Sequence, residues 1–228
     1  MVIYVVEVVE NFELHDKIHV FNDRRHAGKI LAKMLQEYSD RKDVIVLAIP
    51  AGGVPVAVQI SEELNLSWDL AVARKLHIPW NKEAGFGAVS WDGTVVINKP
   101  LVNSLGLSNK EINSSVEKEK VIIQNRLKKF RGNISFPDFN DKIVIVVDDG
   151  LASGFSMLVT VKTLRDKVGK LVVAVPTAPV SAIKLISLFV DKIFCANIRS
   201  GSFFAVATAY RIWYDLTDED VLKFLKKD

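Results

Sequence analysis

The sequence contains a single cysteine, Cys195, among its 228 residues. No disulfide can form within one chain, so we expect a reducing, cytoplasmic location. Charge of one sign is also scarce, because 30 basic and 27 acidic side chains leave a formal net charge of only +3. That excess is too small to indicate a nucleic-acid partner.

Long hydrophobic runs are missing as well. The apolar stretch MVIYVVEVVE at residues 1–10 is short and is interrupted by Glu7. It has no basic region before it and no cleavage site of small residues after it. We therefore expect neither a signal peptide nor a membrane span, and we interpret the stretch as a β-strand.

Several common binding motifs are absent. The sequence has no G-x-x-x-x-G-K-[ST] loop, and GFGAVS at 85–90 lacks the third glycine of a dinucleotide-binding fingerprint. The four histidines show no i, i+4 pairing with acidic residues, so we do not expect a zinc site. The basic run RLKKFR at 126–131 is better explained as a helix end that offsets its own dipole than as a nucleic-acid contact.

What the sequence does have is an alternation of aliphatic runs with helical patterns. Hydrophobic residues make up 49% of the chain, which is enough for a sizeable core. Buried strands separated by helices are typical of an open parallel sheet with helices on both faces, an α/β fold. The expected strands cover 43–49, 69–74, 142–147, 170–176 and 191–197, and the expected helices cover 23–38, 53–64, 156–168 and 180–189.

Two other segments do not continue this alternation. Residues 87–98 form a hairpin pattern around Asp92-Gly93, and Ser108 with Glu111 forms a capping box before a long polar helix that ends near Arg131. We expect one domain, with a core of about 15–98 and 141–198. A small cap, or hood, would come from about 99–140 and 199–228.

The stretch VIVVDDGLASGFSM at 144–157 carries the clearest functional signal. Asp148 and Asp149 follow an aliphatic strand at the sheet edge where ligands of open parallel sheets bind. Gly150 and Gly154 then free the backbone, and the amides at the next helix start could hold a phosphate. Two adjacent carboxylates beside a phosphate make sense if they accept hydrogen bonds from the hydroxyls of a ribose.

This combination resembles the phosphoribosyl diphosphate (PRPP) signature of the type I phosphoribosyltransferases. Ser153, Gly154, Phe155 and Ser156 stand where that family typically has Thr-Gly-Gly-Thr, and only Phe155 changes the character of the pattern. The blocks FNDRRHAGKILAKML, LAIPAGGVPVA, ARKLHIP, NKEAGFGAVSWDG and VVAVPTAP also resemble predicted phosphoribosyltransferases of similar length. The resemblance covers nearly the whole chain from Phe21 and implies the type I phosphoribosyltransferase fold.

The resemblance implies three groups of binding residues. The ribose 5-phosphate would contact Asp148, Asp149, Gly150, Leu151, Ala152, Ser153, Gly154, Phe155 and Ser156. The diphosphate would contact backbone amides of a loop that is often strained or cis, together with two cations: Ala51, Gly52, Gly53, Arg74 and Lys75. An aromatic side chain of the cap could stack on the acceptor base, although most of them are expected in the core. The candidates in the cap are Phe203, Phe204, Tyr210, Trp213 and Tyr214, and the first two are the leading ones.

The reaction implied by the resemblance is displacement of diphosphate from C1 of the ribose by a nitrogen of a nucleobase-like acceptor. Asp148, Asp149, Arg74 and Lys75 would be the catalytic residues, and Mg²⁺ would neutralise the diphosphate. Family members that act on 6-oxopurines commonly have aspartate where this chain has Ala152, which leaves adenine-like or other acceptors open. The family often forms homodimers, with the loop after Arg74 near the neighbouring active site.

Two alternatives belong to other functional classes. Relatives often carry arginine in place of Ala51, so this chain could be a non-enzymatic regulator that binds PRPP or a nucleotide. A receiver-type phosphoacceptor module also begins with a strand and an acid pair. It needs about 100 residues after that pair, whereas 80 follow Asp148 here, so we discount it.

Overall fold

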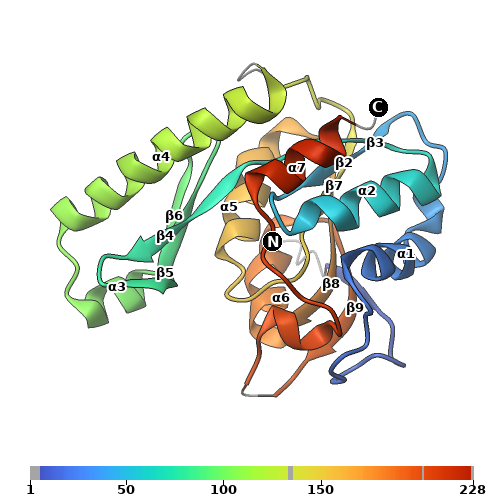
Figure 1. Cartoon of the computed structure of the whole chain (residues 1–228), viewed down its shortest axis with the longest axis horizontal. Coiled ribbons are helices and arrows are strands. Elements are labelled where there is room, and N and C mark those ends of the chain that lie inside the picture. The colour runs from blue at the N-terminus through green and yellow to red at the C-terminus, as the bar shows by residue number, and fades with distance from the viewer. Residues whose placement is uncertain (1–5, 133–135, 202, 227–228) are drawn as a thin grey trace, which may run out of the picture.

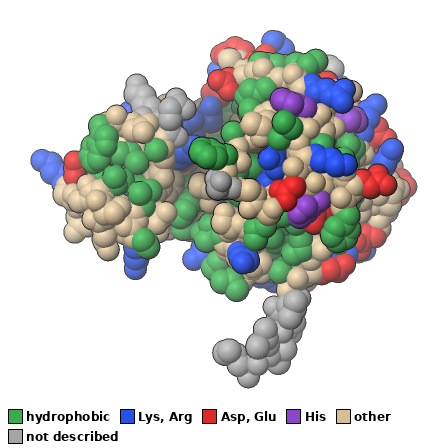
Figure 2. All heavy atoms as spheres, turned by 90° about the horizontal axis from the view of Figure 1, so that it is seen from below, with side chains coloured by type: hydrophobic (Ala, Val, Ile, Leu, Met, Phe, Trp, Pro, Cys, Tyr) green, Lys and Arg blue, Asp and Glu red, His purple; other side chains and the backbone are tan. Residues whose placement is uncertain are grey.

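The computed structural model describes residues 6–132, 136–201 and 203–226. Figure 1 shows two parts, a helix-covered sheet that we call the core and a projection that we call the arm. The arm comprises residues 73–131. The space-filling view in Figure 2 shows the arm as a separate lobe beside the core.

The core is a parallel sheet with the strand order β1-β9-β8-β7-β2-β3, and every neighbouring pair is parallel. Its strands are β1 (Glu7–Glu10), β2 (Val44–Ala48), β3 (Ser67–Leu70), β7 (Ile143–Val147), β8 (Lys170–Pro179) and β9 (Lys192–Arg199). Its helices are α1 (Arg24–Met34), α2 (Gly53–Leu64), α5 (Phe155–Leu164), α6 (Val180–Ile186) and α7 (Asp218–Leu225). The predicted α/β fold is confirmed, and the N-terminal strand lies at a sheet edge.

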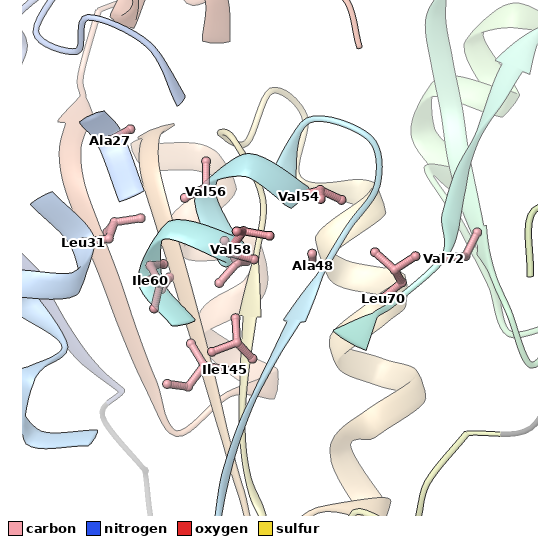
Figure 3. Packing of buried hydrophobic residues seen from close by; sticks show 14 of the residues in the cluster. Ala27, Leu31, Ala48, Val54, Val56, Val58, Ile60, Leu70, Val72 and Ile145 are labelled. Atoms are coloured by element: carbon pink, nitrogen blue, oxygen red, sulfur yellow. The ribbon is translucent and has the colours of Figure 1, made fainter. Parts of the chain in front are cut away.

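Alternate residues of each strand pack into two hydrophobic clusters, one on each face of the sheet. In β7, Ile145 and Val147 pack with α1 and α2, while Val144 and Val146 pack with α5 and α6. Figure 3 shows the first of these clusters, with Leu31 of α1 and Ile60 of α2 close to Ile145. Both faces are buried, which explains why these strands appear in the sequence as continuous aliphatic runs.

Helix starts follow the capping signals of the sequence. The backbone N–H of His26 donates to Oδ1 of Asp23 at 2.8 Å, so Asp23 caps α1. Ser108 and Glu111 form the predicted capping box of α4 (Asn109–Arg131), which ends where the sequence predicted. The terminal cations of α4 are paired, since Arg126 contacts Asp218 and Arg131 contacts Asp69.

The predicted single strand at 69–74 is wrong. β3 ends at Leu70, and β4 (Ala73–Ile78) begins a second, antiparallel sheet with β5 (Asn81–Ser90) and β6 (Val95–Ile97). The aliphatic run does not break, because residues 71–73 stay buried while the chain leaves the edge of one sheet for the other. The predicted hairpin around Asp92-Gly93 is confirmed between β5 and β6.

The arm therefore contains β4, β5, β6, α3 (Lys99–Leu105) and α4. The strands of residues 73–97, which the sequence analysis placed in the core, do not extend the core sheet: among the described residues they pair with each other, and they pack with both α4 and α5. The C-terminal segment returns to the core, where Tyr210 pairs with Phe21 and α7 contacts α2 and α4. Within the described residues, the search for a membrane-spanning helix finds none.

Candidate functional site

A cavity of about 440 Å³ lies where β2 and β7 end. Its walls come from the loop after β2, the loop after β7, the start of β4, the start of α1, helix α4 and the C-terminal segment. The sequence predicted part of this lining, namely Ala51, Gly52, Arg74, Lys75 and all of residues 148–156. The folding of the chain thus brings together three blocks that are far apart in the sequence.

The two adjacent carboxylates are largely removed from water. Asp148 accepts a hydrogen bond from the backbone N–H of Asp149 at 2.8 Å. Burial, together with the charge of Asp149, raises the pKa of Asp148 well above its usual range. Burial also raises the pKa of Asp149, although the nearby guanidinium of Arg24 opposes that rise. Both carboxylates border the cavity, where the hydroxyls of a ribose could donate to them.

Arg24 is the most important site residue that the sequence analysis missed. Its Nε donates to Oδ2 of Asp149 at 2.8 Å, and its Nη1 donates to the backbone oxygen of Tyr214 at 2.9 Å. Its guanidinium carbon lies 3.9 Å from the ring centroid of Trp213, which is a cation–π contact. A signal existed, because an arginine in the first turn of a helix opposes the helix dipole and needs a local reason.

Tyr210, which belongs to the C-terminal segment, supports the acid pair through a hydrogen bond to its backbone. Its hydroxyl donates to the backbone oxygen of Asp149 at 2.6 Å. Burial and the charge of Asp149 raise the pKa of Tyr210, so the hydroxyl keeps its proton and remains a donor. The backbone at the end of β7 is therefore fixed by a residue more than sixty positions away.

The loop after β7 is shaped for an anion at the start of α5. Gly154 adopts the left-handed conformation with φ of +79° and precedes the first residue of the helix. The first-turn residues Phe155, Ser156 and Met157 all line the cavity. Free amides at a helix start, with the helix dipole behind them, favour a phosphate group.

The loop after β2 lies directly against the acid pair. Its Pro50–Ala51 peptide bond is cis, as the family resemblance implied. A Cβ atom on Gly52 would collide with the carboxylate of Asp149, and one on Gly53 would lie 2.7 Å from the backbone oxygen of Val147. These positions require glycine because two loops pack with no room for a side chain.

Arg74 and Lys75 reach the cavity by a different route from the one predicted. They lie near the start of β4 in the arm and do not end a strand of the core. Both residues nevertheless line the cavity. Arg74 is held there by Glu119 of α4, whose Oε2 accepts from Nε at 2.8 Å.

The predicted stacking aromatics are not placed at the site. Phe203 is 93% exposed, and neither it nor Phe204 lines the cavity. Trp213 does line it, along with Val206, Asp215 and Leu216 of the same segment. Composition alone could not choose among the cap aromatics, because the choice depends on where the C-terminal segment crosses the core.

A magnesium ion is compatible with this lining, since carboxylate oxygens, which Mg²⁺ prefers as ligands, border the cavity. Among the described residues, no group of three or more His, Cys, Asp or Glu side chains is arranged to hold a metal ion. Mg²⁺ often keeps waters and substrate oxygens as ligands. The cavity therefore fits a Mg²⁺ ion that is bound mainly through the oxygens of a phosphate-containing ligand.

This fold and site define an α/β protein with a cavity at the carboxyl ends of its strands, bordered by an acid pair and by the start of a helix. Comparison with known proteins gives the family: the model of the phosphoribosyl transferase domain matches residues 21–178, and the chain belongs to this family.

Two Mycobacterium tuberculosis proteins that bear the provisional name phosphoribosyl transferase, from strains CDC 1551 and H37Rv, are each 32% identical to this chain over 209 residues. The match covers 91% of this chain and 47% of theirs, so the chain spans about half the length of these curated relatives. The crystal structure of TT1426 from Thermus thermophilus matches with a TM-score of 0.71 at 28% identity. That match covers 90% of this chain and 97% of the other.

Proposed function

We propose that this protein transfers a 5-phosphoribosyl group from PRPP to a nitrogen of a nucleobase-like acceptor and releases diphosphate. The observation that carries the proposal is that Asp148 and Asp149, the loop after β2 and the glycine loop after β7 line one cavity. These are the parts that a ribose diol, a diphosphate and a 5-phosphate would each need. Membership of the phosphoribosyl transferase family supports the same reaction.

In this mechanism the bond between C1 and the diphosphate oxygen breaks, and its electron pair leaves with the diphosphate. The acceptor nitrogen forms the new bond to C1 and loses its proton to solvent. Positive charge grows on the ribose ring during this exchange, and the carboxylates beneath the ring favour it. The protein mainly positions the two reactants.

Different residues would bind the three parts of PRPP. Asp148 and Asp149 would accept hydrogen bonds from the ribose hydroxyls, and the amides of residues 152–156 would hold the 5-phosphate. The N–H of Leu151 is not available for this, because it donates to the backbone oxygen of Thr177 at 2.9 Å.

Arg74 and Lys75, with the backbone of Ala51 and Gly52, would bind the diphosphate. Arginine suits this role because its guanidinium can donate to two phosphate oxygens at once. Gly53, which the sequence analysis included, lies outside the cavity lining, and its N–H donates to the backbone oxygen of Ile49 at 3.0 Å.

Magnesium is part of the proposal. The ion would be held by oxygens of the diphosphate and ribose, with Asp148 and Asp149 close enough to bind its waters. When bound, it supplies positive charge that offsets the diphosphate. We expect turnover to stop when EDTA removes the ion and to return when Mg²⁺ is added in excess.

The acceptor would enter on the side of the cavity formed by the C-terminal segment. Trp213 offers an aromatic surface there, and Asp215 offers a carboxylate that could accept from an N–H group. Ala152 supplies no carboxylate at the position where relatives acting on 6-oxopurines commonly have one. We therefore propose an adenine-like or other amino-substituted heterocycle, and nucleotide salvage as the cellular role.

Turnover tests the proposal. Purified protein with Mg²⁺ and PRPP is incubated with a panel of purines, pyrimidines and related heterocycles, and diphosphate release is measured. We expect release with at least one acceptor, and we expect Asp149→Asn to lower it at least tenfold. Asp166→Asn is a matched control, because Asp166 is exposed and lies outside the cavity.

The second candidate function is that of a regulator that binds PRPP or a nucleotide without chemistry. Ala51 favours it, since the loop after β2 brings no cation of its own to the diphosphate. Tight PRPP binding without turnover across the whole panel would support the regulator and reject the transferase. Absence of PRPP binding would reject the transferase, and absence of binding to both PRPP and nucleoside monophosphates would reject the regulator as well.

A further inference from the structure

Helix α4 packs on the arm sheet through an apolar stripe that contains one acid. Its buried residues are Val116, Glu119, Ile123, Leu127 and Phe130. Their spacing of three or four residues is that of a single helix face. Glu119 is only 4% exposed, so a carboxylate occupies a position where the pattern calls for an aliphatic side chain.

The partner of this carboxylate is Arg74 of β4. The Nε atom of Arg74 donates to Oε2 of Glu119 at 2.8 Å, and the printed sequence separates the two residues by 45 positions. Within the part of the chain that the structure describes, Arg74 has no other ion-pair partner. The contact engages only the Nε side of the guanidinium, and the two terminal nitrogens retain their donor capacity.

Arg74 also stands between two cavities. It lines the cavity of about 440 Å³ at the acid pair and a second cavity of about 750 Å³ between β4 and α4. Glu119 lines only the second cavity. The carboxylate therefore holds the arginine without bordering the cavity of Asp148 and Asp149.

A contact that only held α4 against β4 would not require a buried ion pair. Burying a charged pair removes two ions from water, and well-packed apolar residues of similar volume often hold such an interface equally well or better. The four other buried residues of the α4 stripe already provide apolar packing. The acid at position 119 is explained if the orientation of Arg74 matters.

We propose that Glu119 is a positioning residue that orders Arg74 for binding of the diphosphate group. By accepting from Nε, the carboxylate fixes the guanidinium plane so that its terminal nitrogens remain available to two phosphate oxygens. An arginine ordered before binding loses less side-chain freedom when the ligand arrives. This inference rests on the proposed function in one respect, namely that Arg74 binds the diphosphate group.

Direct binding of inorganic diphosphate with Mg²⁺, measured by calorimetry, tests the inference without any acceptor. We expect Glu119→Leu to weaken binding about tenfold, since the ordering contact of a charged group is lost. Glu119→Gln keeps an acceptor oxygen for Nε, and we expect it to stay within about threefold of the wild type. Glu117→Gln is the matched control, because Glu117 lies on the exposed face of the same helix and pairs with Lys120.

A double-mutant cycle with Arg74→Leu separates positioning from a general effect on folding. We expect Glu119→Leu to cause no further loss once Arg74 is absent. If Glu119→Leu does not fold, Glu119→Asp takes its place, because it keeps the charge but is one methylene too short to reach Nε. Equal affinity of the leucine variant and the wild type overturns the proposal, and so does an equal loss in both backgrounds.

The outcomes also keep this inference apart from the proposed reaction. Diphosphate binding that depends on Glu119 through Arg74, without turnover on any acceptor, would support the positioning role and reject the transferase. Turnover and diphosphate binding that stay the same when Glu119 is replaced would support the transferase and reject the positioning role. Absence of diphosphate binding by the wild type overturns both.

Discussion

The side chains of Arg24 and Asp149 meet at 2.8 Å although 125 positions separate them in the sequence. The contact joins the start of α1 to the end of β7, and Nη1 of Arg24 extends it to the backbone of Tyr214. One guanidinium thus connects the acid pair to the C-terminal segment that borders the cavity. Removal of this guanidinium should change the free energy of unfolding and the pKa of Asp149.

Replacing Arg24 by leucine should destabilise the protein by about 3 kcal/mol at pH 8, because it leaves a buried carboxylate without its partner. Arg24 lowers the pKa of Asp149 against the effect of burial, so its removal raises that pKa further. Asp149 then takes up a proton more readily as the pH falls, and the loss of stability should shrink at pH 5. Urea unfolding at the two pH values measures the difference.

Arg41 provides the control for this experiment. Its ion pair with Asp43 is exposed, with 43% and 49% of the two side chains accessible. Arg41→Leu should therefore leave the free energy of unfolding almost unchanged at either pH. An Arg24→Leu variant that is no less stable than Arg41→Leu would contradict the role given to the Arg24–Asp149 pair.

Asp148 should lower the stability of the unliganded protein at alkaline pH. Burial and Asp149 raise its pKa in the folded state, so the folded protein binds a proton more strongly than the unfolded chain. Stability from this group is complete at low pH and is lost as the pH rises from the unfolded pKa through the raised folded value. Asp148→Asn should thus be more stable than the wild type at pH 8, by about 1–3 kcal/mol.

The asparagine keeps an oxygen for the backbone N–H of Asp149, so the change removes mainly charge. Chemical denaturation between pH 5 and pH 8 measures the stability gap, which should widen with pH. PRPP binding should weaken at the same time, because activity and stability are in conflict at this position. An Asp148→Asn protein that is less stable than the wild type at pH 8 would refute this interpretation.

Gly52→Ala should damage the site by forcing the loop after β2 away from Asp149. The added Cβ collides with that carboxylate, so we expect a loss of about 1–3 kcal/mol in stability and at least tenfold weaker diphosphate binding. Gly201→Ala is the control, because a Cβ there meets no atom within 4 Å. Thermal unfolding and calorimetry measure the two effects. Wild-type affinity in Gly52→Ala would show that this close approach is unimportant.

A homodimer formed through the arm remains a proposal that the surface supports. Trp80 is 63% exposed and Val121 is 56% exposed, and Figure 2 shows hydrophobic side chains gathered on the displayed face of the arm. Light scattering after size exclusion should give the mass of a dimer, and Trp80→Asp should shift it to the monomer. Leu188 lies on the surface of the core, outside the arm, and is 82% exposed. Leu188→Asp should therefore leave the mass unchanged. A wild-type monomer at micromolar concentration would reject the proposal.

The order of strands and helices, the caps of α1 and α4 and the acid pair with its glycine loop follow from the sequence. Each depends on residues within a few positions of one another: an aliphatic run buried on both sides, a side chain that accepts from an amide three residues on, or a glycine before a helix. The strand expected at 69–74 was wrong because residues 71–73 are equally apolar whether the chain stays in one sheet or passes to another.

Only the tertiary structure decided which distant residues complete the site. Arg24, Trp213 and Tyr210 reach Asp149 or one another across more than sixty positions of sequence, and Glu119 meets Arg74 across the arm. Local patterns carry no record of such contacts, because burial of a charge is decided by what packs around it. The sequence by itself determined most strands of the core and the glycine loop after β7. The packing of the arm and of the C-terminal segment on the core decided which side chains border the cavity.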